Sequence, residues 1–288
     1  MEIKKVGVVG SGIMGTGIAQ VCAQLGYSVI VSGRREEGVS KGLASIDSRL
    51  SSRIERGRLS QQDKDAIMAN IKTTISIKDF ADCDLVIETV NEDLELKKKV
   101  FIELDKVCPG HTILATNTSC LSVTDIAVAT KRPEKVLGMH FHNPAPVMTV
   151  LELVRTIVTS DETIQISTEF VESLGKNVVV APDVAGFIVT RLLTPFVLGA
   201  VRMLEDGIAT RDEIDTACKG ALNHPMGPLE VIDFIGLDTE LSVDETLYEE
   251  TKDPKYAPPA LLRKMVATGW LGRKAGKGFY DYSSQGSP

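Results

Sequence analysis

The residues best suited to acid–base chemistry are two histidines and a carboxylate that follows them. The chain has four histidines, at positions 111, 140, 142 and 224. His140 and His142 lie together in the segment GMHFHNPAPVM, and Glu152 follows in the segment VLELV. An imidazole held by a carboxylate can take the proton of a hydroxyl group near neutral pH, as a hydride-transfer reaction requires. Spacing alone does not decide between His140 and His142.

A His-x-His pair could also hold a metal ion, because residues i and i+2 of a strand share one face. No third nitrogen or sulfur ligand stands out by spacing, so no metal is expected. His111 and His224 are isolated in the sequence, and structural roles are expected for both.

The elements that must position these residues alternate up to about residue 182. Short β-rich runs and amphipathic helical segments follow one another, which is typical of a mostly parallel sheet covered by helices. The predicted strands are 6–9, 29–32, 85–88, 112–116, 136–141, 150–155 and 178–180. After the segment APDVAG only helical periodicity is found. The predicted fold class is α/β, with a Rossmann-type domain over residues 1–184 and an all-α domain over residues 185–288.

A glycine motif marks the predicted cofactor site. Gly10, Gly12 and Gly15 form G-x-G-x-x-G between the first predicted strand and the first helix. The first glycine permits a tight turn, the second lets the backbone approach a pyrophosphate, and the third allows close helix packing. The helix N-terminus, with Ile13 and Met14, then faces the phosphates. This context predicts a dinucleotide cofactor.

The end of the second predicted strand departs from the pattern of an NAD site. An acidic residue about 20 positions beyond the glycines usually accepts hydrogen bonds from the ribose hydroxyls. Gly33 holds that place, flanked by Ser32, Arg34 and Arg35. Ser32 can donate its hydroxyl, and a guanidinium group can donate two charge-assisted hydrogen bonds to a phosphate. These residues predict a preference for NADP(H), with Arg34 as the first ligand of the 2′-phosphate and Arg35 as the second.

The alternative is NAD(H), with Glu36 or Glu37 as the ribose acid and the two arginines in solvent. Both acids lie beyond the end of the strand. There they are expected to pair with the arginines instead.

Composition limits the class of protein. The chain of 288 residues has a net charge of −7, which argues against nucleic-acid and membrane-surface partners. Five scattered cysteines without a C-x-x-C pair fit a reducing compartment. The first predicted strand begins almost at the N-terminus, so no targeting segment is expected and a cytoplasmic location is predicted.

Six motifs spread over nearly the whole chain resemble one family. They are VGSGIMGTGIA, NTSCLSVTDIA, GMHFHNPAPVMTVLELV, GFIVTRLLTPF, HPMGPLEVIDFIGLD and LGRKAGKGFYDY. Together they resemble the 3-hydroxyacyl-CoA dehydrogenases, and within that family the bacterial 3-hydroxybutyryl-CoA dehydrogenases. The resemblance implies an oxidoreductase that interconverts a short-chain 3-hydroxyacyl-CoA and the 3-ketoacyl-CoA.

The resemblance also implies roles for single residues. His140 corresponds to the catalytic histidine, and Glu152 to the carboxylate that orients it. Ser119 and Asn143 correspond to residues that contact the 3-oxygen of the substrate and the nicotinamide. Two residues of the segment NEDLELK correspond to positions near the nicotinamide ribose: Glu92 and Lys97.

The phosphates of coenzyme A require cations. The segment KGLASIDSRLSSRIERGRL puts Arg49, Arg53 and Arg56 on one face of a predicted helix, although a solvated face often has this pattern too. The resemblance favours Arg56 as a coenzyme A contact. Ser52 replaces a lysine of close relatives, so the contact of that lysine is expected to shift to Arg53. Thr190 replaces an asparagine of the family in GFIVTRLL, which changes a hydrogen bond to the substrate.

These observations predict an NADP-linked, short-chain 3-hydroxyacyl-CoA dehydrogenase that forms a homodimer through its C-terminal helical domain. One alternative is a dehydrogenase on the same scaffold that acts on a hydroxy acid or sugar acid without coenzyme A. The other is a catalytically silent NADP-binding protein, which only Thr190 suggests.

Overall fold

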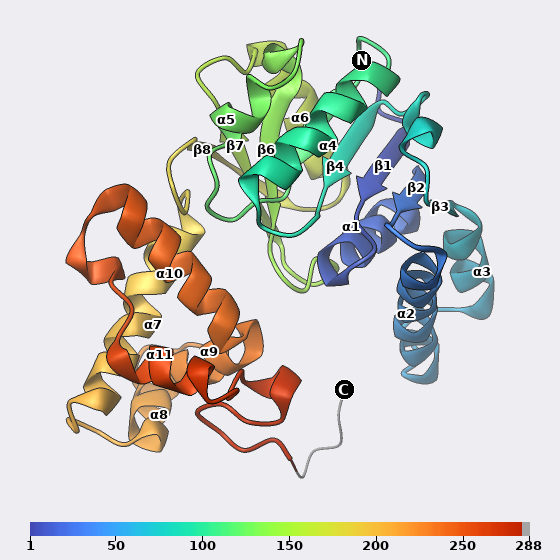
Figure 1. Cartoon of the computed structure of the whole chain (residues 1–288). Helices are drawn as coiled ribbons and strands as arrows, with labels where there is room; N and C mark the ends of the chain where they lie inside the picture. Colours follow the sequence, from blue (N-terminus) through green and yellow to red (C-terminus); the bar gives the residue numbers. More distant parts are fainter. Residues whose placement is uncertain (284–288) are drawn as a thin grey trace. The chain divides into compact units, whose positions relative to one another are not determined.

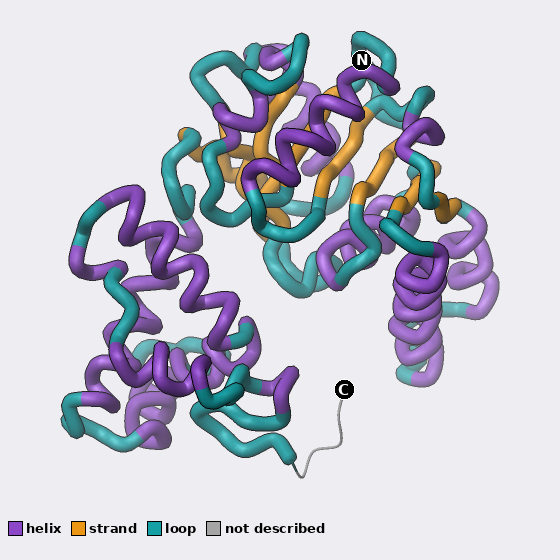
Figure 2. Tube along the Cα trace, viewed as in Figure 1, coloured by secondary structure: helices purple, strands orange, loops and turns teal. Residues whose placement is uncertain are grey.

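The computed structural model describes residues 1–283. The chain divides into two compact units, Met1–Asp183 and Val184–Pro288. Figure 1 labels their helices and strands, and Figure 2 distinguishes the two kinds of element. The first unit contains a sheet with helices and the second is helical, which confirms the predicted fold class.

Within the described residues, the first unit is built on one sheet of eight strands. In sheet order these are β3 (Ile71–Thr74), β2 (Ser28–Ser32), β1 (Lys5–Val9), β4 (Leu85–Glu88), β5 (Ile113–Thr116), β6 (Val136–Phe141), β7 (Val150–Arg155) and β8 (Asn177–Pro182). All neighbouring strands are parallel except β6 and β7, which are antiparallel. The predicted mostly parallel sheet is therefore confirmed.

Strand β3 was not among the predicted strands. It has the sequence IKTT, and only Ile71 is buried. It lies at the edge of the sheet and pairs with β2 alone. A four-residue edge strand with one buried side chain has no apolar run for a sequence pattern to detect.

Helices cover both faces of the sheet. They are α1 (Ile13–Gln24), α2 (Glu36–Glu55), α3 (Gln61–Ala69), α4 (Leu94–Val107), α5 (Val123–Ala127) and α6 (Asp161–Ser173), with 3-10 turns at Ile77–Phe80 and Pro133–Lys135. Buried side chains of α1, α2, α3 and α6 share one core cluster with the strands, and those of α4 and α5 share a second cluster. In Figure 1, α4 crosses the near face of the sheet. Successive strand residues alternate between these two cores, because their side chains point to opposite faces.

The second unit packs helices around a core of its own. They are α7 (Val189–Glu205), α8 (Arg211–Ala221), α9 (Pro228–Ile235), α10 (Leu237–Thr251) and α11 (Ala260–Ala267), with 3-10 turns at Pro254–Tyr256 and Arg273–Ala275. The core includes Val197, Ile232 and Leu262, all fully buried. The buried carboxylate of Asp233 accepts hydrogen bonds of 2.8 and 2.9 Å from the backbone N–H groups of Phe279 and Tyr280. These hydrogen bonds hold residues 279 and 280 against α9.

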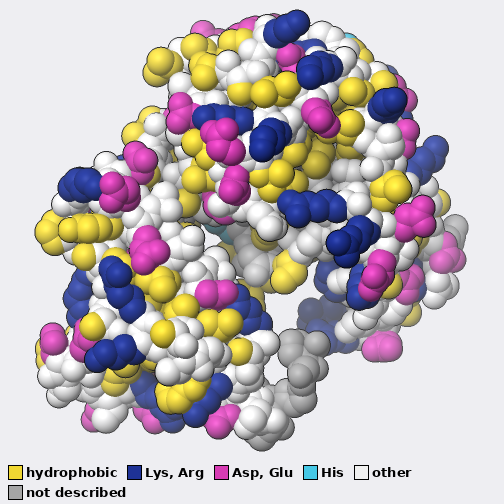
Figure 3. All heavy atoms as spheres, viewed as in Figure 1, with side chains coloured by type: hydrophobic (Ala, Val, Ile, Leu, Met, Phe, Trp, Pro, Cys, Tyr) yellow, Lys and Arg dark blue, Asp and Glu magenta, His cyan; other side chains and the backbone are white. Residues whose placement is uncertain are grey.

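The surface shows both signs of charge. In Figure 3, Lys and Arg side chains lie interspersed with Asp and Glu side chains on the face shown. Among residues 1–283, no helix combines the length and the apolar character that crossing a bilayer would need.

Candidate active site

The centre of the candidate site is a contact between two neighbouring strands. His140 of β6 stands directly opposite Glu152 of β7 in the antiparallel register. Residues that are directly opposite in such a pair project from the same face, so the two side chains meet. His140 Nδ1 lies 2.7 Å from Glu152 Oε2, and the two residues are 5% and 0% exposed. A buried carboxylate therefore holds one ring nitrogen of His140, and Nε2 is the ring nitrogen that can exchange a proton with a substrate.

His142 is close to this pair but differs from His140 in its contacts. Its Nε2 lies 3.7 Å from Glu152 Oε2, and the centroids of the two imidazole rings are 4.5 Å apart. This Nε2 atom is buried and has no hydrogen-bond partner among the described residues. Burial, followed by the charge of His140, lowers the pKa of His142 to about 4, against the opposing effect of Glu152. His142 is therefore uncharged at neutral pH.

The two histidines and Glu152 also bear on the question of a metal. One ligand atom from each of the three residues lies within 4.8 Å of the others. The carboxylate of Glu152 is thus a candidate third ligand, which a search for nitrogen and sulfur ligands in the sequence did not include. The expectation that no metal is bound stays a prediction.

A second buried ion pair stands on the same face of the sheet, at the end of β4. Glu88 is 0% exposed, and its two carboxylate oxygens lie 2.9 and 3.1 Å from Lys97 Nζ of α4. Thr116 of β5 donates a hydrogen bond of 2.7 Å to Oε2 of the same carboxylate. Burial raises the pKa of Glu88 even though Lys97 and Thr116 act to lower it. The desolvation cost therefore outweighs the ion pair.

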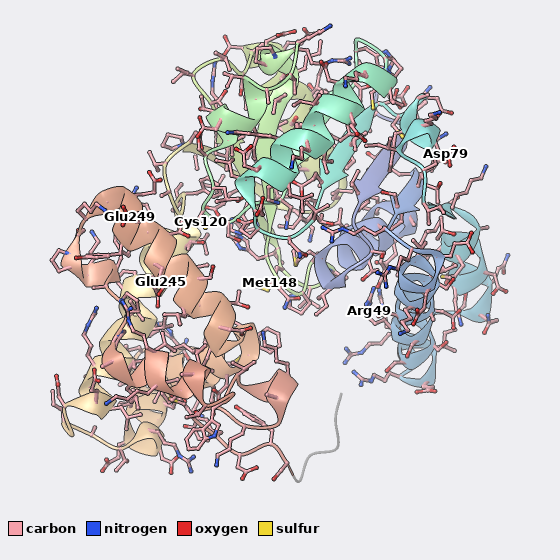
Figure 4. All side chains as sticks on the ribbon, in the orientation of Figure 1. Arg49, Asp79, Cys120, Met148, Glu245 and Glu249 are labelled. Carbon is pink, nitrogen blue, oxygen red and sulfur yellow. The ribbon has the colours of Figure 1, made fainter. Side chains whose placement is uncertain are left out.

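Glu92 joins this pair to the loop after β5. It lies 3.3 Å from Lys97 Nζ and accepts a hydrogen bond of 2.9 Å from the backbone N–H of Ser119. The hydroxyl of Thr118 donates to the same carboxylate. Cys120, labelled in Figure 4, follows directly, with its Sγ 3.9 Å from Oε1 of Glu92. The structure therefore brings Glu92, Lys97 and Ser119 together.

Side chains that the sequence reasoning missed hold the loops around His140. Asn117 Oδ1 accepts a hydrogen bond of 2.8 Å from the backbone N–H of Phe141, which ties the loop after β5 to β6. Lys176 Nζ donates to the carbonyl oxygens of Ala145 and Met148, at 2.8 and 2.6 Å, and so fixes the loop that begins at Asn143. Asn143 itself is exposed in that loop. Asn117 lies beside Ser119 in the NTSC motif, but the sequence holds no signal for the role of Lys176.

The glycine loop fits the close approach of a dinucleotide backbone. Gly10 has φ +121°, and a Cβ at Gly15 would lie 1.9 Å from the carbonyl oxygen of Gly10. Gly12 is the N-cap of α1, no side chain caps this end, and the first turn has no acidic residue. Ile13 is 75% exposed and Met14 is half-buried. The end of α1 therefore presents backbone N–H groups and a positive dipole end, which suits a pyrophosphate.

The end of β2 carries the residues predicted to decide the cofactor. Ser32 is buried, Gly33 half-buried, and Arg34 and Arg35 are exposed just before α2. The acid of the first turn that forms an ion pair is Glu37, whose carboxylate lies 2.7 Å from the ammonium group of Lys41. The expected pairing of Glu37 with an arginine is therefore wrong, because Lys41 stands one helical turn along on the same face.

The residues predicted to bind coenzyme A lie on α2 and at its end, and Thr190, predicted to contact the substrate, lies on α7. Arg49, labelled in Figure 4, donates hydrogen bonds of 2.8 Å to Gln20 and to Ser45, so its guanidinium is held within the domain. Arg53 is half-buried on the last turn of α2, and Arg56 is exposed as the C-cap. Thr190 is half-buried in the first turn of α7, in the second unit.

Comparison with known proteins identifies relatives of the chain over both units. The NAD binding domain of 3-hydroxyacyl-CoA dehydrogenase matches residues 5–184, and the C-terminal domain of the same family matches residues 186–282. A 3-hydroxybutyryl-CoA dehydrogenase of Bradyrhizobium diazoefficiens is 45% identical over 280 residues, or 97% of this chain and 96% of that protein. The crystal structure of M. tuberculosis FadB2 gives a TM-score of 0.96 at 43% identity, covering 98% of this chain and 100% of that one. That of (S)-3-hydroxybutyryl-CoA dehydrogenase PaaH1 from Ralstonia eutropha gives 0.92 at 43% identity, covering 98% and 99%.

These matches agree with the geometry of the first unit. A loop built for a pyrophosphate lies in a domain whose family model is that of an NAD binding domain, so the cofactor is a nicotinamide dinucleotide. Both family models and full-length relatives at more than two fifths identity point to one conclusion. The chain belongs to the 3-hydroxyacyl-CoA dehydrogenase family.

Proposed function

We propose that the protein is a 3-hydroxybutyryl-CoA dehydrogenase that interconverts short-chain 3-hydroxyacyl-CoA and 3-ketoacyl-CoA. The observation that carries this proposal is the 2.7 Å contact between His140 and Glu152 at the end of β6. The names of the full-length relatives support the choice of substrate.

His140 is the proposed general base and acid. When bound, the nicotinamide dinucleotide supplies the acceptor or donor of the hydride. In the oxidising direction His140 Nε2 takes the proton of the 3-hydroxyl group, while Nδ1–H keeps its hydrogen bond to Glu152. The carboxylate stabilises the imidazolium that forms and fixes its orientation. In the reducing direction the imidazolium returns the proton to the forming alkoxide.

Ser119 and Asn143 are proposed to donate hydrogen bonds to the 3-oxygen and to the nicotinamide amide. Donors that are already in place stabilise negative charge as it develops on oxygen. Glu92 supports Ser119 by accepting a hydrogen bond from its backbone N–H. Lys176 supports the loop of Asn143 through its contacts with the carbonyl oxygens of that loop.

Coenzyme A is proposed to bind through Arg53 and Arg56, with Thr190 at the acyl end of the substrate. Arg49 contributes less to coenzyme A, because its Nε and one terminal nitrogen donate hydrogen bonds to Gln20 and Ser45 and the other terminal nitrogen is buried. We further propose a homodimer formed by the helical unit and a cytoplasmic location.

The cofactor is proposed to be NADP(H) in preference to NAD(H). Gly33 leaves no carboxylate at the end of β2, and Arg34 and Arg35 are exposed beside it. A 2′-phosphate would meet cations there and no opposing acid from position 33.

A turnover assay tests the proposed reaction. The purified protein is supplied with acetoacetyl-CoA and either NADPH or NADH, and oxidation of the reduced nicotinamide is followed by absorbance. We expect turnover, faster with NADPH at low cofactor concentration. No turnover with either cofactor contradicts the proposed reaction. Equal rates on a short 3-keto acid without coenzyme A would favour the non-CoA alternative.

Arg34 provides the sharper test of cofactor preference. Because hydrogen bonds to charged groups contribute about 1.5–3 kcal/mol, Arg34→Gln should lower kcat/KM for NADPH by about 10- to 100-fold and change that for NADH little. The matched control is Arg263→Gln, an exposed arginine of α11 that contacts Glu245 at 3.7 Å. Native preference for NADH refutes the cofactor proposal.

A further inference from the structure

Ser11 occupies the space in which a ribose-binding acid would begin. It lies between Gly10 and Gly12 in the glycine loop and is half-buried. A Cβ at Gly33 would lie 2.8 Å from Ser11 Oγ and 2.6 Å from Val39 Cγ2. Both distances are shorter than a methyl group tolerates, and Val39 is a buried, β-branched residue with little rotamer freedom. Ser11 and Val39 therefore leave too little space for any side chain at position 33, which favours glycine there.

The contact between Ser11 and the Cβ position of Gly33 lies on the side of Gly33 that faces the expected ribose. An acid at the end of this strand hydrogen-bonds the adenosine ribose, so the Cα–Cβ bond of such an acid leads toward the 2′-position. Ser11 Oγ lies within 2.8 Å of the point that this bond would reach at Gly33. The hydroxyl of Ser11 therefore stands on the ribose side of Gly33.

The surroundings of Ser11 leave its hydroxyl available to a ligand. Its Oγ would lie 3.6 Å from a Cβ at Gly38, and its own Cβ 3.3 Å from one at Gly42, so glycines of α2 make room for it. Within residues 1–283 the Ser11 side chain forms no hydrogen bond to another protein group. A half-buried hydroxyl without a protein partner, close to Gly33, which Arg34 and Arg35 follow in the chain, suits a phosphate oxygen.

We propose that Ser11 is a specificity-determining residue for the cofactor. Its hydroxyl donates a hydrogen bond to the 2′-phosphate, and its side chain excludes an acid from position 33. This inference rests on the proposed preference for NADP(H). It makes Ser11 a ligand of the 2′-phosphate in addition to the two arginines. Gly33→Asp by itself is therefore expected to disturb the packing of Ser11 and Val39 as well as the preference between NADPH and NADH.

The first experiment removes only the hydroxyl. Ser11→Ala keeps the Cβ and should lower the ratio of kcat/KM for NADPH to that for NADH by about tenfold, the effect of one hydrogen bond to a charged group. The control is Ser242→Ala, at an exposed serine of α10. Binding of 2′,5′-ADP and of 5′-AMP, measured by calorimetry on the same proteins, gives a readout without turnover: only the 2′-phosphorylated ligand should weaken.

The outcomes separate this inference from the proposal beneath it. If the native protein prefers NADH, the cofactor proposal fails and the phosphate role of Ser11 fails with it. If the native protein prefers NADPH but Ser11→Ala leaves the ratio and the 2′,5′-ADP affinity unchanged, only the role of Ser11 is wrong.

A second experiment tests the exclusion of side chains from position 33. Gly33→Ala is made in the native protein and in the Ser11→Gly, Val39→Ala background, where the two contacting side chains are shortened. We expect Gly33→Ala to reduce the melting temperature and the affinity for both cofactors in the native protein. In the altered background both reductions should be smaller. Equal losses in both backgrounds would show that Ser11 and Val39 do not reserve the position.

Discussion

At the scale of single residues, the two imidazoles of the HFHNP segment differ in their distance to one carboxylate. His140 lies 2.7 Å and His142 3.7 Å from Glu152 Oε2. We predict that His140→Ala and Glu152→Ala each reduce kcat by about a hundredfold to ten-thousandfold, because a positioned general base is lost or no longer held. His142→Ala should be mild, because a neutral imidazole at that distance transfers no proton. Steady-state kinetics on the three variants decide this, and equal damage from His142→Ala would overturn the assignment.

Thr190, in the first turn of α7, is proposed to lie at the acyl end of the substrate. We predict that Thr190→Asn changes kcat or the preference for acyl length more than the KM of the cofactor, since the longer amide adds a donor on the substrate side. The measurement is a series of 3-ketoacyl-CoA substrates of increasing length at saturating cofactor. A changed cofactor KM with an unchanged substrate profile would show that Thr190 has been placed wrongly.

At the scale of elements, the end of β4 and the first turns of α4 depend on a buried ion pair. Lys97 and Glu88 are both inaccessible to solvent, and burial raises the pKa of Glu88. We predict that Lys97→Met costs about 3–5 kcal/mol of unfolding free energy, because Glu88 is left as an uncompensated buried charge. Replacing both residues, as Lys97→Met with Glu88→Leu, should recover much of that loss.

Denaturant unfolding of the single and double variants measures this coupling. The control is Lys98→Met, which removes a neighbouring lysine whose partner Glu95 is exposed. A Lys97→Met protein as stable as the control would contradict the view that β4 and α4 are joined through this pair.

At the scale of the whole molecule, the helical unit carries a buried acid pair that opposes its own stability. Glu240 and Asp244 lie one turn apart on α10, 3% and 0% exposed, and neither oxygen of Asp244 has a hydrogen-bond partner in the described chain. Burial, together with the charge of Glu240, raises the pKa of Asp244 far above its ordinary value of 3.8. The folded unit therefore binds protons that the unfolded chain releases, and the stability present below the unfolded pKa is lost as pH rises toward the folded pKa.

We predict that Asp244→Asn stabilises the protein by about 1–3 kcal/mol near neutral pH and flattens the fall of the melting temperature above about pH 4. Thermal unfolding at several pH values measures both effects. The control is Glu245→Gln, the exposed neighbour labelled with Glu249 on α10 in Figure 4. A steeper fall of stability with pH in Asp244→Asn than in the native protein would refute the sign of this argument.

Much of the architecture could be predicted from the sequence, because it depends on local patterns. The apolar runs of β1, β2 and β4 to β8 are typical of buried strands, and the glycine motif requires a turn that few other residues can form. The helical periodicity after residue 187 likewise predicted the second unit. These features depend on residues that are close together in the sequence, so they can be recognised without knowledge of distant contacts.

Tertiary structure decided which polar groups meet. The register of β6 on β7 sets His140 opposite Glu152, and the order of β4 beside β5 sets Thr116 against Glu88. The space at position 33 is limited by Val39 and by Ser11, which is 22 residues away along the chain yet 2.8 Å from the Cβ that glycine lacks. Such contacts join residues that are distant in sequence, and their distances follow from strand pairing and packing, which no local pattern encodes.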